Sequence, residues 1–503
     1  MPISDIGLEA EFTYEGDPGR AIDEPPFRVL MLGDWSGGAE GPVSGRRPIE
    51  VDRDNFDEVM ARLKPHVDLD FDDGSTLSLE FASLDDLHPD EIFRRVPVFS
   101  ELRDLRKRLR GSDSFNAAAY EARQMFGIEP QTAPGAAQAS PVESSGDSLL
   151  DSILAQPSGG AAAPKRGASG ELGGLVKELV RSHLVTVDED EQTTLISAVD
   201  AATSRLMRSI LHHRRFQEME AAWRGLFFQV RRTDTSGDLK IYVLDISKGE
   251  LENDLKSANE LSTTLLYKVL IRDAVETPGG EPWAFVGGNY ALSPIVDDVA
   301  ALMRVSRNCA AAGVPFVAHM RPDVLGVHSL DEHPDPSEWS TNTETDAAKL
   351  WTALRGQPES QYLGMTIPRF LCRLPYGFDT EPLETFEFEE FDGDPAHDDY
   401  CWANACFLSA LLHARSYSAS GWDEMGGRLE QDVEGLPLHM YKTDGETIYT
   451  PCAEIQMTDK GVEKLMEFGL TPLISYRAMD KVRIGRHQSI ADPVTGLRGK
   501  WNS

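Results

Sequence analysis

Two stretches near the start of the chain carry hydrophobic positions in the pattern of β-strands. Leu8, Ala10, Phe12 and Tyr14 alternate with polar residues, which is the period of a strand that buries one of its faces. Residues 27–32 (FRVLML) are hydrophobic with a single charged interruption and predict a second, more buried strand. We therefore expect an edge strand followed by a strand that lies deeper in the fold.

A helix and a hairpin follow these strands. Residues 55–65 place four hydrophobic side chains on one helical face and stop at a proline. Alternating residues over 67–71 and 77–81 flank an Asp73-Gly74 turn, which predicts a β-hairpin. The strongly charged stretch 101–110 (ELRDLRKRLR) predicts a long helix that closes this part of the chain.

The second half of the chain alternates between helical and strand patterns. The expected helices cover residues 171–187, 195–228 and 295–312, and the expected strands cover residues 238–247, 282–292 and 315–320. Strands that alternate with helices indicate a mixed α/β (α+β) fold.

The composition changes abruptly at residues 128–170, where Ala, Pro, Gly, Ser and Gln dominate. Such a composition predicts a disordered linker. We expect this linker to join two lobes, one formed by residues 1–127 and the other by residues 171–490. Residues 491–503 are then a C-terminal tail.

A short amphipathic helix is predicted within the linker, at residues 148–156 (SLLDSILAQ). Leu149, Leu150, Ile153 and Leu154 fall on one helical face and have no local core to enter. Two explanations stay open: the helix binds a partner protein, or it docks on the surface of its own chain.

Composition and charge narrow the classes of partner. The chain has 503 residues, of which 41% are hydrophobic and 26% charged, as in a soluble globular protein of two or three domains. Its formal net charge of -34 repels nucleic acid and anionic lipid, so we expect neither nucleic acid nor membrane as a partner. The 5 scattered cysteines, the lack of a signal-peptide pattern and the lack of a long apolar span predict a cytoplasmic location.

One segment gathers residues that zinc prefers. His397, Cys401, Cys406 and His413 lie close in sequence, but their spacing does not match the familiar zinc pairs. We expect Cys401 and Cys406 on a helix, as small buried core residues. We predict no metal and no cofactor, and keep a zinc-dependent module as an alternative.

Three other motifs have structural explanations. The aspartates within residues 68–72 fit the solvated face of the hairpin better than a calcium loop. Residues 33–38 (GDWSGG) lack the lysine and hydroxyl of a phosphate-binding loop and predict a glycine turn. We expect His212 and His213 to be structural or interfacial, so no catalytic residue is predicted. A hydrolase that uses one of these histidines remains an alternative.

Longer strings in the first part of the chain resemble the small sheath subunit of type VI secretion, the TssB (VipA) family. The strings are EAEFTYEG, PPFRVLMLGDWSG, RRPIEVDRDNFDEVMARLKP and LEFASLDDLHPDEIFRRVPVFSELRDLRKRL. They follow one another in the order of that family across almost all of residues 1–125. The resemblance implies that this part of the chain is a small-subunit domain.

Strings beyond the linker resemble the large sheath subunit, the TssC (VipB) family, over about residues 148–489. They are ILHHRRFQEMEAAWRGLFFQV, PRFLCRLPYG, FEFEE, YCWANACF and GLPLHMYKTDGE. The two resemblances together imply a natural fusion of both subunits. Such a protein is expected to be a non-enzymatic structural subunit of a contractile sheath, which repacks its interfaces on contraction.

The resemblance also implies partners and roles for particular residues. The expected partners are other copies and other sheath subunits, an Hcp-like inner tube, baseplate components and a ClpV-like unfoldase. The family joins its subunits by strand exchange, and Leu8, Ala10, Phe12 and Tyr14 are suited to adding a strand to a neighbour's sheet. An ordinary edge strand within the domain remains the alternative explanation.

The family's unfoldase grips an N-terminal helix of the large subunit. That role falls here on Leu149, Leu150, Ile153 and Leu154.

This sequence departs from the large-subunit pattern in two places. The family carries a further region after the point that matches residues 488–489, whereas this sequence stops at Ser503. The family string YLWGNA is written here as YCWANA, with Cys401 and Ala403 at the changed positions. The alternative of the same class is therefore a non-contractile accessory homologue that acts as a cap, an adaptor or a baseplate-associated protein.

Overall fold

A computed structural model describes residues 25–38, 41–111, 113–127, 191–235, 237–340, 344–427, 429–443 and 445–502. The residues predicted for strand exchange and for unfoldase binding lie outside these ranges. So do the segment predicted as a linker and the helix predicted at residues 171–187. Those assignments, and the domain boundaries, stay predictions.

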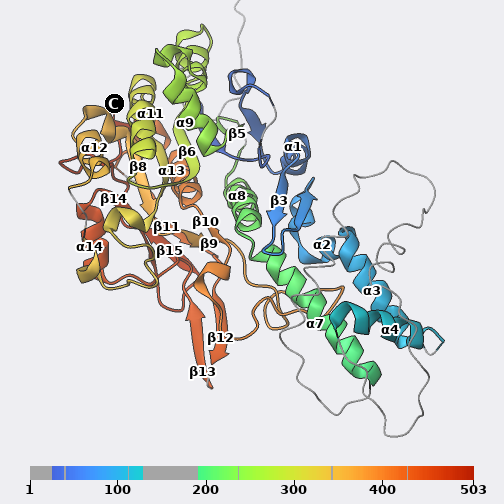
Figure 1. Cartoon of the computed structure of the whole chain (residues 1–503). Coiled ribbons are helices and arrows are strands. Elements are labelled where there is room, and N and C mark those ends of the chain that lie inside the picture. The colour runs from blue at the N-terminus through green and yellow to red at the C-terminus, as the bar shows by residue number, and fades with distance from the viewer. Residues whose placement is uncertain are drawn as a thin grey trace, which may run out of the picture.

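A nine-stranded sheet forms the centre of the described fold (Figure 1), in the order β11-β15-β14-β8-β7-β6-β1-β5-β2. The strands, in chain order, are β1 (Phe27–Gly33), β2 (Ile49–Val51), β5 (Leu239–Asp245), β6 (Phe285–Leu292), β7 (Phe316–Met320), β8 (Leu363–Ile367), β11 (Asp432–Glu434), β14 (Leu470–Ser475) and β15 (Lys481–Ile484). The six strands from β14 to β5 run parallel, and β2, β15 and β11 are antiparallel to their neighbours.

Three antiparallel pairs lie outside this sheet. They are β3 (His66–Asp70) with β4 (Thr76–Glu80), β9 (Phe370–Leu371) with β10 (Trp402–Ala403), and β12 (His439–Thr443) with β13 (Glu446–Thr450). The predicted hairpin is the first pair, and its aspartates Asp68 and Asp70 are exposed, as expected for a solvated face.

The helices cover both faces of the sheet and extend away from it along the first part of the chain. Their bounds are α1 (Phe56–Leu63), α2 (Pro89–Arg95), α3 (Pro97–Arg110), α4 (Phe115–Phe126), α7 (Glu191–Leu211), α8 (Arg214–Arg231), α9 (Lys248–Ser257), α10 (Leu265–Tyr267), α11 (Val296–Ala312), α12 (Asp346–Arg355), α13 (Cys406–Met425) and α14 (Asp459–Glu467), with a π-helical stretch at η4 (Lys268–Glu276). The long helix α7 runs beside α3 and α4 (Figure 1). The described residues just before position 128 and just after position 190 therefore pack together.

Strand β1 is central because it is hydrophobic on both faces. Val29 and Met31 point into a core shared with α13 and α8, whereas Leu30 and Leu32 point into a second core shared with α9 and α11. All four side chains are fully buried. A strand with apolar side chains on both sides fits only between two layers of helices, which is the environment of a parallel sheet.

The sheet joins parts of the chain that are far apart in sequence. β1 pairs in parallel with β5 on one side, from Phe27 opposite Leu239 to Gly33 opposite Asp245, and with β6 on the other side. The mixed α/β fold class is thus confirmed. The sequence did not predict that these parts share one sheet.

The helix expected over residues 195–228 is two helices. α7 ends at Leu211 and α8 begins at Arg214, because His213 adopts an extended conformation and caps the second helix. Its ring Nδ1 accepts the backbone N–H of Arg215 at 3.2 Å. A side chain that satisfies a free N–H at a helix start favours a new helix over a continuous one.

None of the helices within the described ranges has both the length and the hydrophobicity that crossing a lipid bilayer requires.

Candidate functional site: the joint between the two parts of the chain

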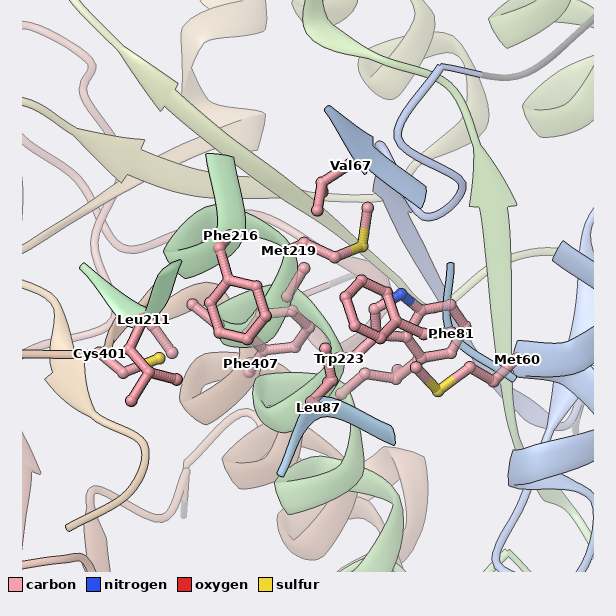
Figure 2. Packing of buried hydrophobic residues seen from close by; sticks show 14 of the residues in the cluster. Met60, Val67, Phe81, Leu87, Leu211, Phe216, Met219, Trp223, Cys401 and Phe407 are labelled. Atoms are coloured by element: carbon pink, nitrogen blue, oxygen red, sulfur yellow. The ribbon is translucent and has the colours of Figure 1, made fainter. Parts of the chain in front are cut away.

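The described residues before and after position 128 meet along an extended apolar contact, which we call the joint. The N-terminal part is residues 25–127 and the C-terminal part is residues 191–502. Figure 2 shows the middle of the joint, where the side chains of both parts point toward one another. The labelled residues from the N-terminal part are Met60, Val67, Phe81 and Leu87, and those from the C-terminal part are Leu211, Phe216, Met219, Trp223, Cys401 and Phe407.

Trp223 on α8 is the centre of this contact. It is fully buried, and its ring packs edge-on against Trp35 at 5.5 Å and against Phe56 at 5.7 Å between centroids. Its indole N–H donates to the backbone carbonyl of Trp35 at 3.1 Å. A buried tryptophan with a satisfied N–H removes a large apolar area from water and leaves no polar group unpaired.

Helix α8 packs closely on α13 behind Trp223. A Cβ atom at Gly225 would lie 2.5 Å from a ring carbon of Phe407, which is too close for any other residue at this position. The small residue on α8 therefore lets the Phe407 ring lie against the helix backbone and fill the joint from the side of α13.

Polar contacts fix the register of β1 beside β5. Oδ1 of Asp245 accepts the backbone N–H groups of Trp35 at 2.8 Å and of Ser36 at 3.2 Å. The glycine turn predicted at residues 33–38 is confirmed: Oδ1 of Asp34 accepts the N–H groups of Gly37 and Gly38, both at 2.9 Å. Gly37 has a φ of +79°, and a Cβ there would meet the carbonyl oxygen of His66.

Arg46 adds a charged contact across the same edge. Its guanidinium donates to the backbone carbonyl of Asp245 at 2.8 Å and to both carboxylate oxygens of Glu250, at 2.5 and 2.8 Å. The hydrogen bonds from Arg46 hold the pKa of Glu250 below its ordinary value. A bidentate arginine–carboxylate pair fixes orientation as well as adding energy, so it sets how the two parts meet.

The far end of the joint is held by a carboxylate on α2. Asp90 accepts the backbone N–H groups of Glu384 and Thr385, both at 3.0 Å, and the hydroxyl of Thr385. Burial opposes ionisation of Asp90, but these hydrogen bonds outweigh it and lower its pKa. Beside them, the ring of Phe386 stacks on Phe93 at 4.5 Å.

A buried ion cluster supports the loop that makes these contacts. Arg373 donates to Glu220 on α8 at 2.8 Å and to both oxygens of Glu390, at 2.7 and 2.8 Å. Arg224 bonds the same Glu220 at 2.8 Å and also the hydroxyl of Tyr376. Burial raises the pKa of Glu390, but the charge of Arg373 prevails and lowers it to about 2. The cluster thus stays ionised and ties the loop to α8.

A cleft of about 910 Å³ lies at the carboxyl ends of the parallel strands, with walls from both parts of the chain. Its cationic side chains are already paired: Lys248 lies 2.7 Å from Asp298, Arg321 lies 3.1 Å from Asp323, and Arg369 lies 2.9 Å from Glu454. Each of these three cations therefore already has a carboxylate partner within the chain.

The two histidines singled out in the sequence take part in structural contacts. His212 lies with Nδ1 3.4 Å from Asp399 and Nε2 3.6 Å from Glu390, and its ring stacks on Phe391. His213 caps α8, and its Nε2 lies 3.2 Å from the carbonyl oxygen of Asp70. The His213 ring therefore contacts the N-terminal part across the joint, whereas the partners of His212 all lie within the C-terminal part.

The four candidate zinc ligands are engaged with different neighbours. His397 stacks on Trp402, Cys401 lies beside Cys372, and His413 lies against His487. Cys406 is fully buried in the core at the start of α13. Among the described residues, no three His, Cys, Asp or Glu side chains are arranged to hold a metal ion. The prediction that Cys401 lies on a helix is wrong: it directly precedes strand β10, and α13 begins only at Cys406.

The residues that matter most at the joint were not recognised in the sequence. No sequence pattern singled out Asp245, Glu220, Arg373 or Glu390. The family resemblance was the signal that could have pointed to this region, since Trp223 and Glu390 both fall inside strings that resemble the sheath family.

Two family models match the chain, one on each side of the joint. Residues 193–491 match the model described as "EvpB/VC_A0108, tail sheath N-terminal domain". Residues 11–119 match the model described as "Type VI secretion system, VipA, VC_A0107 or Hcp2".

A curated relative agrees with the first of these matches. The "Type VI secretion system sheath protein TssC1" of Pseudomonas aeruginosa is 34% identical over 309 residues. The alignment covers 60% of this chain and 61% of the relative, so less than two thirds of the relative's length is matched.

Proposed function

Since the chain belongs to the EvpB/VC_A0108 tail sheath family over residues 193–491 and matches VipA over residues 11–119, we propose that one copy joins a small and a large sheath subunit as a pair. In this proposal, copies of the pair assemble into the wall of a type VI secretion sheath. Covalent fusion then fixes the ratio of the two subunits at one to one.

The single observation that carries this proposal is the place of β1. The VipA-like part supplies an interior strand to a sheet whose neighbouring strands, β5 and β6, come from the sheath-domain part. A strand paired on both sides and buried on both faces belongs to a permanent interface, because withdrawing it would expose two rows of backbone groups and two apolar faces. The pair is thus one folding unit, as a building block of an assembly requires.

We propose that copies are joined through strand exchange by residues 8–14. An extended segment that adds to a neighbour's sheet gains affinity from backbone hydrogen bonds and specificity from alternate side chains, here Leu8, Ala10, Phe12 and Tyr14. Contraction then needs no chemistry from the chain, because repacking between two stable interface arrangements releases energy stored during assembly. We accordingly propose no catalytic residue and no cofactor, and a cytoplasmic location.

Negative-stain microscopy of the purified full chain tests assembly, with and without the secretion components encoded beside it. We expect tubes or rings, and we expect Phe12→Asp to abolish them while leaving a soluble protein. Glu11→Gln, a change at the adjacent polar position, is the matched control and should assemble normally. Normal tubes from Phe12→Asp would contradict strand exchange, and a small oligomer under every condition would favour the non-contractile accessory homologue.

We further propose that a ClpV-like unfoldase binds residues 148–156, and that an Hcp-like tube and baseplate components are the other partners. Leu150→Asp places a charge among Leu149, Ile153 and Leu154 and should weaken unfoldase binding several-fold. Ser152→Asp adds the same charge at a polar position and should bind normally. Equal binding of both variants would contradict the proposed role of this segment.

A hydrolase remains the alternative from another class. It predicts turnover that is lost when His212 or His213 is changed to Asn. The contacts of both rings with neighbouring carboxylates, carbonyls and Phe391 predict instead that these changes reduce stability only.

A further inference from the structure

Two cysteines face each other across the short strand pair β9–β10. The pairing of Phe370 with Ala403 and of Leu371 with Trp402 brings Cys372 and Cys401 opposite one another as the next pair. The backbone N–H of Cys372 donates to the carbonyl of Cys401 at 3.1 Å, and the two Sγ atoms lie 3.2 Å apart. Both cysteines are free thiols in this structure.

The other cysteines have different surroundings. Cys309 and Cys406 are fully buried among hydrophobic side chains of the two cores, and the thiol of Cys452 lies 3.3 Å from the carbonyl oxygen of Met479. Cys372 is only partly buried, whereas Cys401 is 2% exposed. The pair therefore combines a partly exposed cysteine with a buried cysteine whose sulfur atom is in contact with it.

The geometry favours a covalent bond between the two sulfur atoms. Neighbouring residues on antiparallel strands have Cα atoms about 4.5 to 5.5 Å apart, which falls within the range that disulfides span. An S–S bond is about 2.05 Å long, so the sulfur atoms need to approach by roughly 1 Å. Side-chain rotation provides such a movement without moving the strands.

We propose that Cys372 and Cys401 are an oxidisable dithiol, which hydrogen peroxide converts into a disulfide that joins β9 to β10. The Cys372 sulfur, on losing its proton, attacks one peroxide oxygen; the O–O bond breaks, leaving a sulfenic acid on Cys372 and releasing water. The Cys401 sulfur then attacks the sulfenic sulfur; the S–O bond breaks, and the oxygen leaves with the Cys401 proton as a second water. Two thiols lose two electrons and one peroxide gains them.

The order of these steps follows from the surroundings of each thiol. Burial raises the pKa of Cys401 well above its ordinary value, so this thiol stays protonated and out of reach of the oxidant. Cys372 meets peroxide first because it is the more exposed of the two. Cys401 is in contact and resolves the sulfenic acid before a second peroxide arrives.

The disulfide would close the loop that holds the far end of the joint. Residues 373–400 lie between the two cysteines and include Glu390, which binds Arg373, and Thr385 and Phe386, which bind α2. Linking the ends of this loop restricts the unfolded chain more than the folded one. Oxidation should therefore stabilise the contact between the two parts of the chain, whether or not the protein forms a sheath.

Mass spectrometry of the peroxide-treated full chain tests the proposal. After treatment and alkylation of the remaining thiols, we expect three alkylated cysteines in place of five, and a proteolytic fragment that links Cys372 to Cys401. Cys452→Ser is the matched control and should form the same link. Cys401→Ser should instead collect oxygen adducts on Cys372, and equal circular dichroism spectra would show that both variants fold.

A second measurement needs no variant. The thermal midpoint of the oxidised wild-type chain should rise by several degrees and return to its starting value on addition of dithiothreitol. Oxygen adducts on Cys372 of the wild type with Cys401 still alkylated would overturn the proposal. So would a link to any other cysteine or between two copies, or an unchanged thermal midpoint in a chain that carries the link.

Discussion

The backbone N–H of Trp35 donates a hydrogen bond of 2.8 Å to Oδ1 of Asp245, across 210 positions of sequence. The two residues stand at the carboxyl ends of neighbouring parallel strands, β1 and β5, one from each part of the chain. Because the same oxygen also accepts the N–H of Ser36, the carboxylate satisfies two backbone donors that leave the sheet at this point. One side chain thereby fixes where β1 ends relative to β5.

Asp245→Ala should lower the free energy of unfolding by about 2 to 3 kcal/mol, because two buried N–H groups lose a charged acceptor. Urea unfolding followed by tryptophan fluorescence measures this change. Asp245→Asn keeps an acceptor oxygen without the charge and should fall between the wild type and Asp245→Ala. Asp72→Asn, at an exposed position of the hairpin turn, is the control and should have no effect.

Trp223→Ala should destabilise the chain by about 3 to 5 kcal/mol, since it leaves a cavity between Trp35 and Phe56 and an unpaired carbonyl on Trp35. Limited proteolysis should then cut the two parts of the chain apart more readily. Tyr120→Ala removes a half-exposed aromatic from α4 and should leave the cleavage rate unchanged. Equal cleavage of the two variants would show that Trp223 does not hold the joint.

The low pKa of Glu390 predicts that the folded chain loses stability in acid. Its pKa of about 2 in the folded chain is below the ordinary value of 4.5, so the unfolded chain binds the proton more readily. The stabilisation is complete above pH 4.5 and is lost as the pH falls toward 2. A shift of this size corresponds to roughly 3 kcal/mol.

Urea midpoints measured from pH 6 down to pH 2 test the role of Glu390. Glu390→Gln should be less stable than the wild type at pH 6 and should lose less stability between pH 4.5 and 2. Glu446→Gln, at an exposed position on β13, should keep the full acid dependence of the wild type.

The low pKa of His487 predicts that acidification causes a further loss of stability, which begins at a higher pH than the loss due to Glu390. Burial lowers its pKa to about 4, and its ring lies 4.5 Å from that of His413, whose pKa burial also lowers. Because the folded chain keeps both rings neutral, stability is complete above pH 6.5 and declines as the pH falls from 6.5 toward 4. His487→Gln keeps a donor for the carbonyl of Glu430. In this variant the stability should therefore depend less on pH between 6.5 and 4.

The control for His487 is His328→Gln, because the side chain of His328 is 97% exposed. That variant should follow the wild-type profile between pH 6.5 and 4. A flat wild-type profile in this window would mean that the two buried rings do not titrate with unfolding.

Residues 27–32, 56–63 and 66–80 show how far local pattern predicts this fold. The first is an apolar run, the second places its apolar residues at helical spacing, and the third alternates around an Asp-Gly turn. All three form the predicted elements. These patterns succeed because each reflects contacts made within a few residues or against one buried face.

The same local reasoning missed the break at His213 and the place of Cys401. His213 continues the helical pattern on either side of it, and only its contact with the N–H of Arg215 shows that a new helix begins there. Cys401 precedes a two-residue strand whose pairing with β9 is too short to leave an alternating pattern. Neither feature is encoded by periodicity.

The candidate site was less predictable than the fold. Arg373 and Glu390 are charged residues in charged surroundings. Glu390 is bound by Arg373, and Arg373 in turn contacts Glu220, 153 positions earlier. From the sequence alone such residues are expected on the solvated surface, because the burial of a charge depends on a partner that is distant in the chain.

The sequence by itself determined the α/β class, most of the strands and helices, and the likeness of the two parts of the chain to two sheath subunits, because these depend on residue pattern over short stretches. Tertiary structure alone decided that β1 lies between β5 and β6, that Asp245 receives the end of β1, and that Cys372 meets Cys401. The residue pattern of a strand does not say which strand some 200 residues away it pairs with in parallel. Any apolar strand has the same hydrophobic pattern, and only packing on both faces selects the partner.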